Sequence, residues 1–90
     1  MEKRIGVIAI LLTGKSSVDK LNGILSSYSR IIIGRQGVPI REQGIHVISV
    51  IVEGTTDEIG ALTGKIGKLA DVEVKSVLTK YREGNFKDDK

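Results

Sequence analysis

Two stretches of the chain are apolar at nearly every position: KRIGVIAILLT (residues 3–13) and IHVISVIVEG (residues 45–54). Isoleucine and valine dominate both stretches, and continuous apolar character predicts strands with both faces buried. The shorter run RIIIG (residues 30–34) predicts another strand. DVEVKSVLTKY (residues 71–81) alternates apolar and charged residues, which predicts a strand near a sheet edge with one wet face.

Two segments instead have the spacing of an amphipathic helix. The first covers residues 17–29, with Ser16 or Ser17 as its N-cap. Its apolar positions are Val18, Leu21, Ile24, Leu25 and Tyr28. The second covers residues 55–70, begins with a Thr55–Glu58 capping box, and has the apolar stripe Ile59, Leu62, Ile66 and Leu69.

Three glycines, Gly60, Gly64 and Gly67, share another face of the second helix. Glycine costs about 0.5–1 kcal/mol relative to alanine in a helix. This face therefore predicts either a close approach to another backbone or a weak helix.

The order β-α-β-β-α-β predicts an α+β, ferredoxin-like fold: a four-stranded antiparallel sheet with two helices on one face and strands one and three central. We expect one domain over residues 1–81 and a polar C-terminal tail over residues 82–90. Two helices cover only one face of the sheet, although the central strands are apolar on both. An exposed apolar face marks an interaction surface, so we expect a homodimer or homotetramer.

Composition narrows the functional classes. The chain has 90 residues, no cysteine, one histidine and a formal net charge of +3. Disulfides, thiolate nucleophiles and thiolate metal sites are excluded. The longest apolar run is far short of the ~20 residues of a membrane span, and no signal peptide precedes it, so we expect a cytoplasmic protein that does not bind membranes. The richness in isoleucine and dispersed charge hints at a thermophile.

The stretch GRQGVPIREQGI (residues 34–45) holds three glycines and the only proline. It resembles the phosphate loop of acylphosphatases, but it joins two strands and no helix N-terminus follows it, so we reject that interpretation. We interpret it as the end of an edge strand and its hairpin. Gly34 and Gly37 would allow a bulge, Pro39 would sit at the edge, and Gly44 would adopt a positive φ.

This stretch also carries the candidate binding residues. Arg30, Arg35, Arg41 and His46 could hold a small anionic ligand between subunits. Alternatively, the arginines are solvated or pair with Glu42 and Glu53. The full set of ligand or interface candidates is Arg30, Gly34, Arg35, Gly37, Arg41, Glu42, His46, Gly60 and Gly64.

Catalysis, metal binding and cofactors are not expected. A lone histidine without a spaced serine or acid does not form a nucleophilic set, and it does not make a metal site within one chain. The predicted central strands carry no aromatic residue on which RNA bases could stack, so direct nucleic-acid binding by this chain alone is not expected.

The segments GRQGVPIRE (residues 34–42) and TTDEIGALTGKIGKL (residues 55–69) resemble the iron-only hydrogenase system regulator family of small bacterial proteins. The resemblance implies an ACT-like domain, similar to the C-terminal domain of the nickel-responsive repressor. The histidine–cysteine set that binds nickel there has no counterpart here. The first loop also lacks the Asp-x-Pro-Gly-x-Leu pattern of amino-acid-binding ACT domains.

The resemblance implies a regulatory, ligand-sensing oligomeric domain associated with [FeFe]-hydrogenase. The alternative is a structural or protein-interaction module with no small-molecule ligand. A partner protein would then take the place of the ligand.

Overall fold

Strands and helices form in the predicted order. The computed structural model describes residues 2–82, with β1 (Arg4–Leu12), α1 (Val18–Ser27), β2 (Ile32–Ile40), β3 (Ile45–Gly54), α2 (Thr56–Gly67) and β4 (Val72–Arg82). Short 3₁₀ turns, Ser29–Ile31 and Arg41–Gln43, precede and follow β2. β4 runs one residue past the predicted domain end, and the rest of the predicted tail lies outside the described residues.

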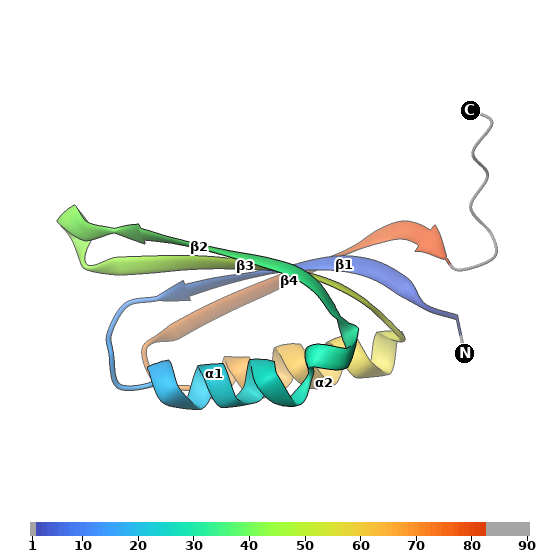
Figure 1. The fold of residues 1–90 in the computed structure, drawn as a ribbon, viewed down its shortest axis with the longest axis horizontal. Coiled ribbons are helices and arrows are strands. Elements are labelled where there is room, and N and C mark those ends of the chain that lie inside the picture. Colours follow the sequence, from blue (N-terminus) through green and yellow to red (C-terminus); the bar gives the residue numbers. More distant parts are fainter. Residues whose placement is uncertain (1, 83–90) are drawn as a thin grey trace.

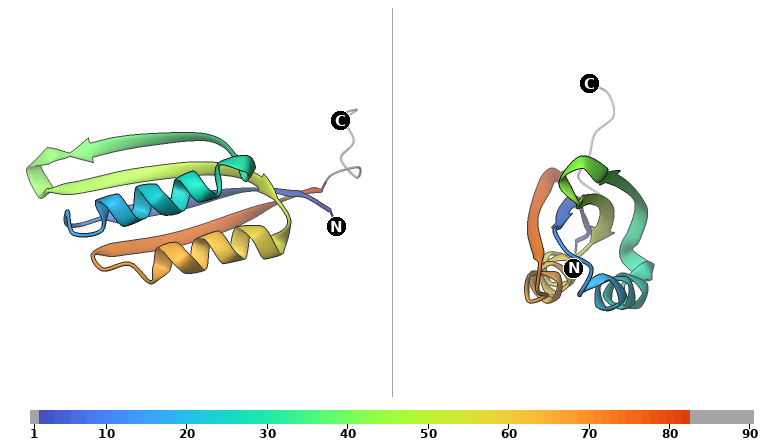
Figure 2. Two further views of the ribbon diagram at one scale, coloured as in Figure 1. Left: turned by 60° about the horizontal axis from the view of Figure 1, so that its bottom comes forward. Right: turned by 90° about the vertical axis from the view of Figure 1, so that its left-hand side faces the viewer.

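The sheet has the strand order β2-β3-β1-β4, and all its neighbouring strands are antiparallel. The prediction that strands one and three are central is confirmed. Both helices lie on one side of the sheet, and the other side is left uncovered (Figure 1). Figure 2 shows the two helices side by side beneath the curved sheet. The predicted α+β, ferredoxin-like fold is therefore confirmed.

The core lies between the sheet and the helices. The predicted helix stripes supply Leu21 and Leu25 from α1 and Ile59, Leu62 and Ile66 from α2, while Leu69 is only partly buried. The sheet supplies alternate residues of the two central strands: Ile8, Ile10, Leu12, Ile48, Val50 and Val52. Alternation puts their neighbours on the opposite side of the sheet.

That opposite side, called here the open face, is apolar at its centre. Val7 pairs with Ile51 and with Val77 across the neighbouring strands, and their side chains are 39%, 43% and 65% exposed. Ala9 and Ser49 form the next pair on this face, followed by the apolar pair Leu11 and Val47. The charged residues in the same alternation lie toward the margin: Glu53, Glu73 and Lys75. An apolar centre with a charged margin is the usual anatomy of a protein interface.

The N-cap of α1 lies at a predicted residue, but its side chain is bonded differently from a usual cap. Ser17 occupies the N-cap position, but its side chain makes no cap hydrogen bond. Its hydroxyl instead donates to the Ala70 carbonyl at 2.6 Å, and the Ser16 hydroxyl donates to the Asp71 carboxylate at 2.7 Å. The Thr13 amide also donates to the Asp71 carbonyl at 2.9 Å. These bonds tie the β1–α1 loop to the α2–β4 turn, so tertiary partners have replaced the local cap.

The glycines of α2 do not mark a close approach within the chain. A Cβ atom on Gly60 or Gly64 would meet nothing within 4 Å, whereas one on Gly67 would lie 3.4 Å from Val74. Only Gly67 therefore packs against the sheet. Whether Gly60 and Gly64 contact a second copy stays a prediction.

The β2–β3 hairpin matches the interpretation of GRQGVPIREQGI. The register of β2 against β3 shifts between Ile32 and Gly34, which is the predicted bulge. Pro39 lies on edge strand β2, where its missing N–H costs no central ladder bond. Gly44 has φ 67°, as the turn into β3 requires. The hairpin tip projects beyond the ends of the helices (Figure 1).

Candidate ligand-binding site

A pocket of about 490 Å³ lies between the β1–α1 loop and the tip of the β2–β3 hairpin. Small-molecule pockets in proteins usually have about 300–1,000 Å³, so this volume suits a small ligand. The pocket exists because the hairpin extends past α1, which leaves the underside of the tip uncovered by the helix layer.

The lining consists of apolar and basic side chains together with two glycines. The apolar residues come from both walls: Leu12, Val18, Pro39, Ile40 and Ile45. The basic residues are Lys15, Arg41 and His46, and the glycines are Gly14 and Gly44. None of these lining residues is acidic. The pocket therefore combines an apolar floor with a positive rim.

Within residues 2–82, neither of the two permanent cations of the pocket takes part in a salt bridge. The one salt bridge recorded among residues 2–82 joins Arg30 to Glu58, and it involves neither Lys15 nor Arg41. The Asp71 carboxylate lies on the loop side, close to Gly14, but it accepts the Ser16 hydroxyl. Neither Lys15 nor Arg41 is held in an ion pair within the described residues, and the acid beside the loop wall is Asp71.

The His46 ring lies next to Gly37. The two residues lie on the same side of the β2–β3 pair, and a Cβ atom on Gly37 would be 3.2 Å from the imidazole Nε2. The glycine leaves room for the ring to lie across β2. A larger residue at position 37 would require the exposed His46 ring to shift by a few tenths of an ångström.

The structure does not gather the four predicted cationic residues into one site. Arg41 and His46 line the pocket, whereas Arg30 lies before the start of β2 and Arg41 after its end. The nine-residue strand β2 separates Arg30 from Arg41, and a strand of that length spans about 30 Å. Arg35 is exposed on β2 opposite Val50, outside the pocket lining.

The remaining candidates are also dispersed. Glu42 is exposed in the turn at the hairpin tip and does not line the pocket, and Gly34 lies at the bulge. Lys15 was missed by sequence reasoning, which concentrated on residues 30–46. Its signal was the break GKSS directly after an apolar strand, a position where loops commonly face ligands.

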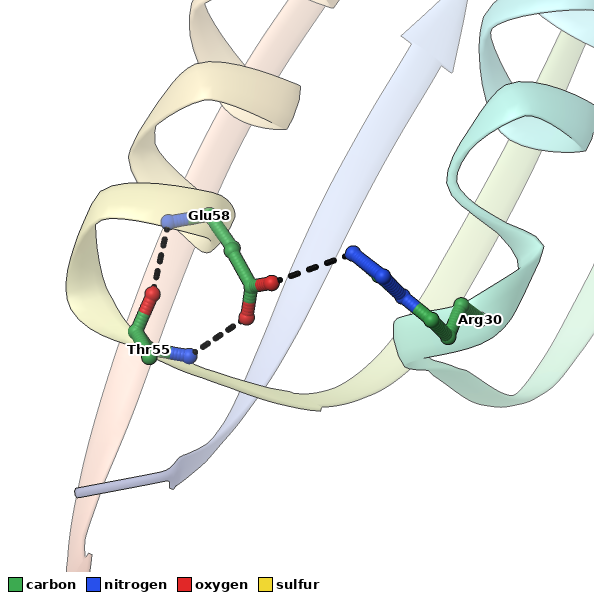
Figure 3. Close-up of polar contacts among 3 residues, drawn as sticks. All are labelled: Arg30, Thr55 and Glu58. Carbon is green, nitrogen blue, oxygen red and sulfur yellow. Dashed lines mark hydrogen bonds and ion pairs between the residues drawn. The ribbon is translucent and has the colours of Figure 1, made fainter. Parts of the chain in front are cut away.

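Arg30 belongs to a structural cluster at the N-terminus of α2 (Figure 3). The Glu58 amide donates to the Thr55 hydroxyl at 3.1 Å, and the Thr55 amide donates to the Glu58 carboxylate at 2.9 Å, which confirms the capping box. The Arg30 guanidinium donates to the other carboxylate oxygen at 3.2 Å. The hydrogen bond from the Thr55 backbone, reinforced by the charge of Arg30, lowers the pKa of Glu58 below its ordinary value of 4.5.

This shift predicts a pH dependence of folding stability. A carboxyl whose pKa is lower in the folded state stabilises the fold above its unfolded pKa, and that contribution is lost as the pH falls through the folded pKa. We expect the wild type to lose stability below pH 4.5 more steeply than Glu58→Gln, which keeps a side-chain acceptor without the titrating charge. Urea unfolding at several pH values between about 3 and 7 measures this difference. Parallel curves for the two proteins would contradict the assignment.

Within the described residues, His, Cys, Asp and Glu side chains form no group that could hold a metal ion. Neither helix in residues 2–82 is long and apolar enough to cross a membrane. The pocket is therefore the feature of the described chain that best fits a binding role.

The arrangement of sheet and helices defines an ACT-like domain. The solved ACT domain of GTP pyrophosphokinase from Chlorobium tepidum has a TM-score of 0.71 and 19% identity, over 83% of this chain and 99% of that one. A formyltetrahydrofolate deformylase from Pseudomonas putida shares the fold with a TM-score of 0.58 and 9% identity, over 81% of this chain and 28% of that one. At these identities the likeness shows the fold alone.

A more specific relation comes from the uncharacterized protein TM1266 of Thermotoga maritima. Its structure has a TM-score of 0.83 and 33% identity, over 87% of this chain and 99% of that one. The TM1266-like family model, described as "Iron-only hydrogenase system regulator, putative", matches residues 4–76. The chain belongs to this family. No curated protein matches the chain.

Proposed function

We propose that the protein is a cytoplasmic, ligand-sensing regulatory domain of the iron-only hydrogenase system and that it works as a homo-oligomer without catalysing a reaction. Membership of the TM1266-like family supports the regulatory role. The observation that carries the sensing role is the pocket between the β1–α1 loop and the hairpin tip, where Lys15 and Arg41 have no recorded counter-ion in the described chain.

The open face supports self-association. It places apolar side chains such as Val7 and Ile51 at the centre of the sheet, with 39% and 43% of each exposed. A second copy would present the same apolar centre and the same charged margin, so a two-fold arrangement can match the two surfaces. The dimer and the tetramer are both compatible with this surface.

A protein-interaction module without a small ligand is the second candidate, and the open face favours it as well. In that case the apolar centre would seat a different protein, and the pocket would have no functional occupant. The two candidates therefore differ in whether a small molecule stabilises the fold.

A thermal-shift panel distinguishes them. Amino acids, nucleotides, S-adenosylmethionine and metal salts are each titrated against the protein. A ligand present at 100 times its Kd adds about 2.7 kcal/mol, which raises the Tm of a domain this small by about 10–20 °C. We expect a saturable shift from at least one compound. The absence of any shift, together with capture of a stoichiometric protein partner, would support the interaction module instead.

A further inference from the structure

We infer that the pocket binds a small molecule that has one anionic head group and an aliphatic body. The inference rests on the proposed sensing role and specifies the chemistry of its ligand.

The head group is defined by the cations of the two walls. Lys15 belongs to the β1–α1 loop and Arg41 to the hairpin tip, so an anion between the walls can contact both. The Arg41 guanidinium offers a planar pair of donors that fits a carboxylate or a phosphate, and Lys15 adds a point charge. His46 contributes a third nitrogen donor or acceptor on the hairpin wall. The electrostatic match favours an anion over a neutral or cationic group.

The aliphatic body of the ligand is inferred from the absence of polar groups among the other side chains of the pocket lining. Apart from the three basic residues, its side chains are Leu12, Val18, Pro39, Ile40 and Ile45, which carry no hydrogen-bonding group. Leu12 is only 4% exposed and connects the pocket floor to the core. The hydroxyl groups of a sugar or nucleoside would lose their water there without gaining side-chain partners. An alkyl body would gain from the apolar contact.

One wall of the pocket is already fixed. Four hydrogen bonds from Thr13, Ser16 and Ser17 hold the β1–α1 loop against residues 70–71. A preformed wall reduces the ordering that a ligand must bring about, which favours affinity.

The test is an NMR titration of the full chain, labelled with ¹⁵N, against four probes that share a six-carbon body. Hexanoate and hexyl phosphate carry the anion, hexanamide is neutral and hexylamine is cationic. We expect saturable amide shifts over residues 12–18 and 39–46 with either anion, and at least about tenfold weaker binding of hexanamide and hexylamine. The tighter of the two anions identifies the head group as a carboxylate or a phosphate.

The variants Lys15→Gln and Arg41→Gln should each weaken binding of the anions by about five- to tenfold. Lys80→Gln removes the same charge near the other end of β4 and should leave the affinity unchanged. All three substitutions are on exposed side chains, and their NMR spectra report whether the fold is intact.

Three results would overturn the inference: equal binding of hexanamide, shifts outside the two segments, or no saturable shift from any probe up to about 10 mM. Equal affinities in Lys15→Gln, Arg41→Gln and Lys80→Gln would overturn it as well. If the thermal-shift panel finds a neutral or cationic ligand while the anions fail, the ligand class is wrong and the sensing role stands. If the panel and the anions both fail, the sensing role fails too.

Discussion

Val7→Lys is expected to convert the protein from an oligomer to a monomer at micromolar concentration. Val7 lies at the centre of the open face, on a central strand and directly opposite Ile51. In a sheet-to-sheet assembly, a lysine there would be buried against the apolar centre of the partner without a counter-ion. The cost of several kcal/mol for an unpaired buried charge weakens association by about 10³-fold or more.

The same substitution should leave the single chain folded. Val7 is 39% exposed before any association, so the stem of a lysine can cover the apolar surface while its ammonium group reaches water. Analytical ultracentrifugation gives the mass of the wild type and the variant, and circular dichroism melts show whether the variant remains folded. Ile51→Lys, at the paired position, should have the same effect.

Ala61→Lys is the matched control, because Ala61 is exposed on α2, on the covered side of the sheet. It adds the same charge and should leave the oligomer intact. If Ala61→Lys dissociates the oligomer while Val7→Lys does not, the interface lies on the Gly60–Gly64 side of α2. A wild type that is already monomeric at micromolar concentration would contradict self-association altogether.

The architecture could be predicted from the sequence because the hydrophobic pattern of each element and the order of the elements indicate the same fold. Continuous Ile/Val runs marked the two central strands, and the single-stripe pattern of the helices showed that each buries only one side. The open face followed from counting layers: two helices cannot cover both sides of a four-stranded sheet. The capping box at Thr55 and Glu58 was predictable because both partners are three residues apart.

The errors arose where a side chain found a distant partner. Ser17 has the identity of an N-cap, but the Ala70 carbonyl, 53 residues away, takes its hydroxyl. Arg30 belongs with Glu58 rather than with the other predicted cations. Neither pairing follows from spacing along the chain, since both depend on how helices and turns meet across the fold.

The candidate pocket was half predictable for the same reason. The hairpin residues Arg41 and His46 stood out because their stretch is dense in glycine, proline and charge. Lys15 did not, because it is 26 residues from Arg41 and only the projection of the hairpin over the β1–α1 loop brings both to one pocket. A pocket formed by two loops is a property of their lengths and directions, which residue patterns do not encode.

Leu62→Ala is expected to destabilise the fold strongly. Leu62 is 0% exposed at the middle of α2, between the helix and the sheet. Removing its side chain loses the transfer free energy of the buried atoms and leaves a cavity that a small core cannot close, so the free energy of unfolding should fall by about 3–4 kcal/mol. For a domain of this size, the Tm should fall by about 12–30 °C.

Ile33→Ala provides the comparison, because it removes a similar amount of side chain at a position that is 58% exposed beside the bulge of β2. Its cost should stay below about 1 kcal/mol. Urea unfolding measures the loss in free energy of unfolding for both variants. Because alanine replaces a large aliphatic residue in each, a difference between the two losses reports the effect of burial. Equal losses would mean that Ile33 is buried by an assembly contact in solution. Ile33 lies on an edge strand and Val7 on a central one. Measuring the cost of Ile33→Ala again in the Val7→Lys variant would show whether the open-face assembly is the contact that buries Ile33.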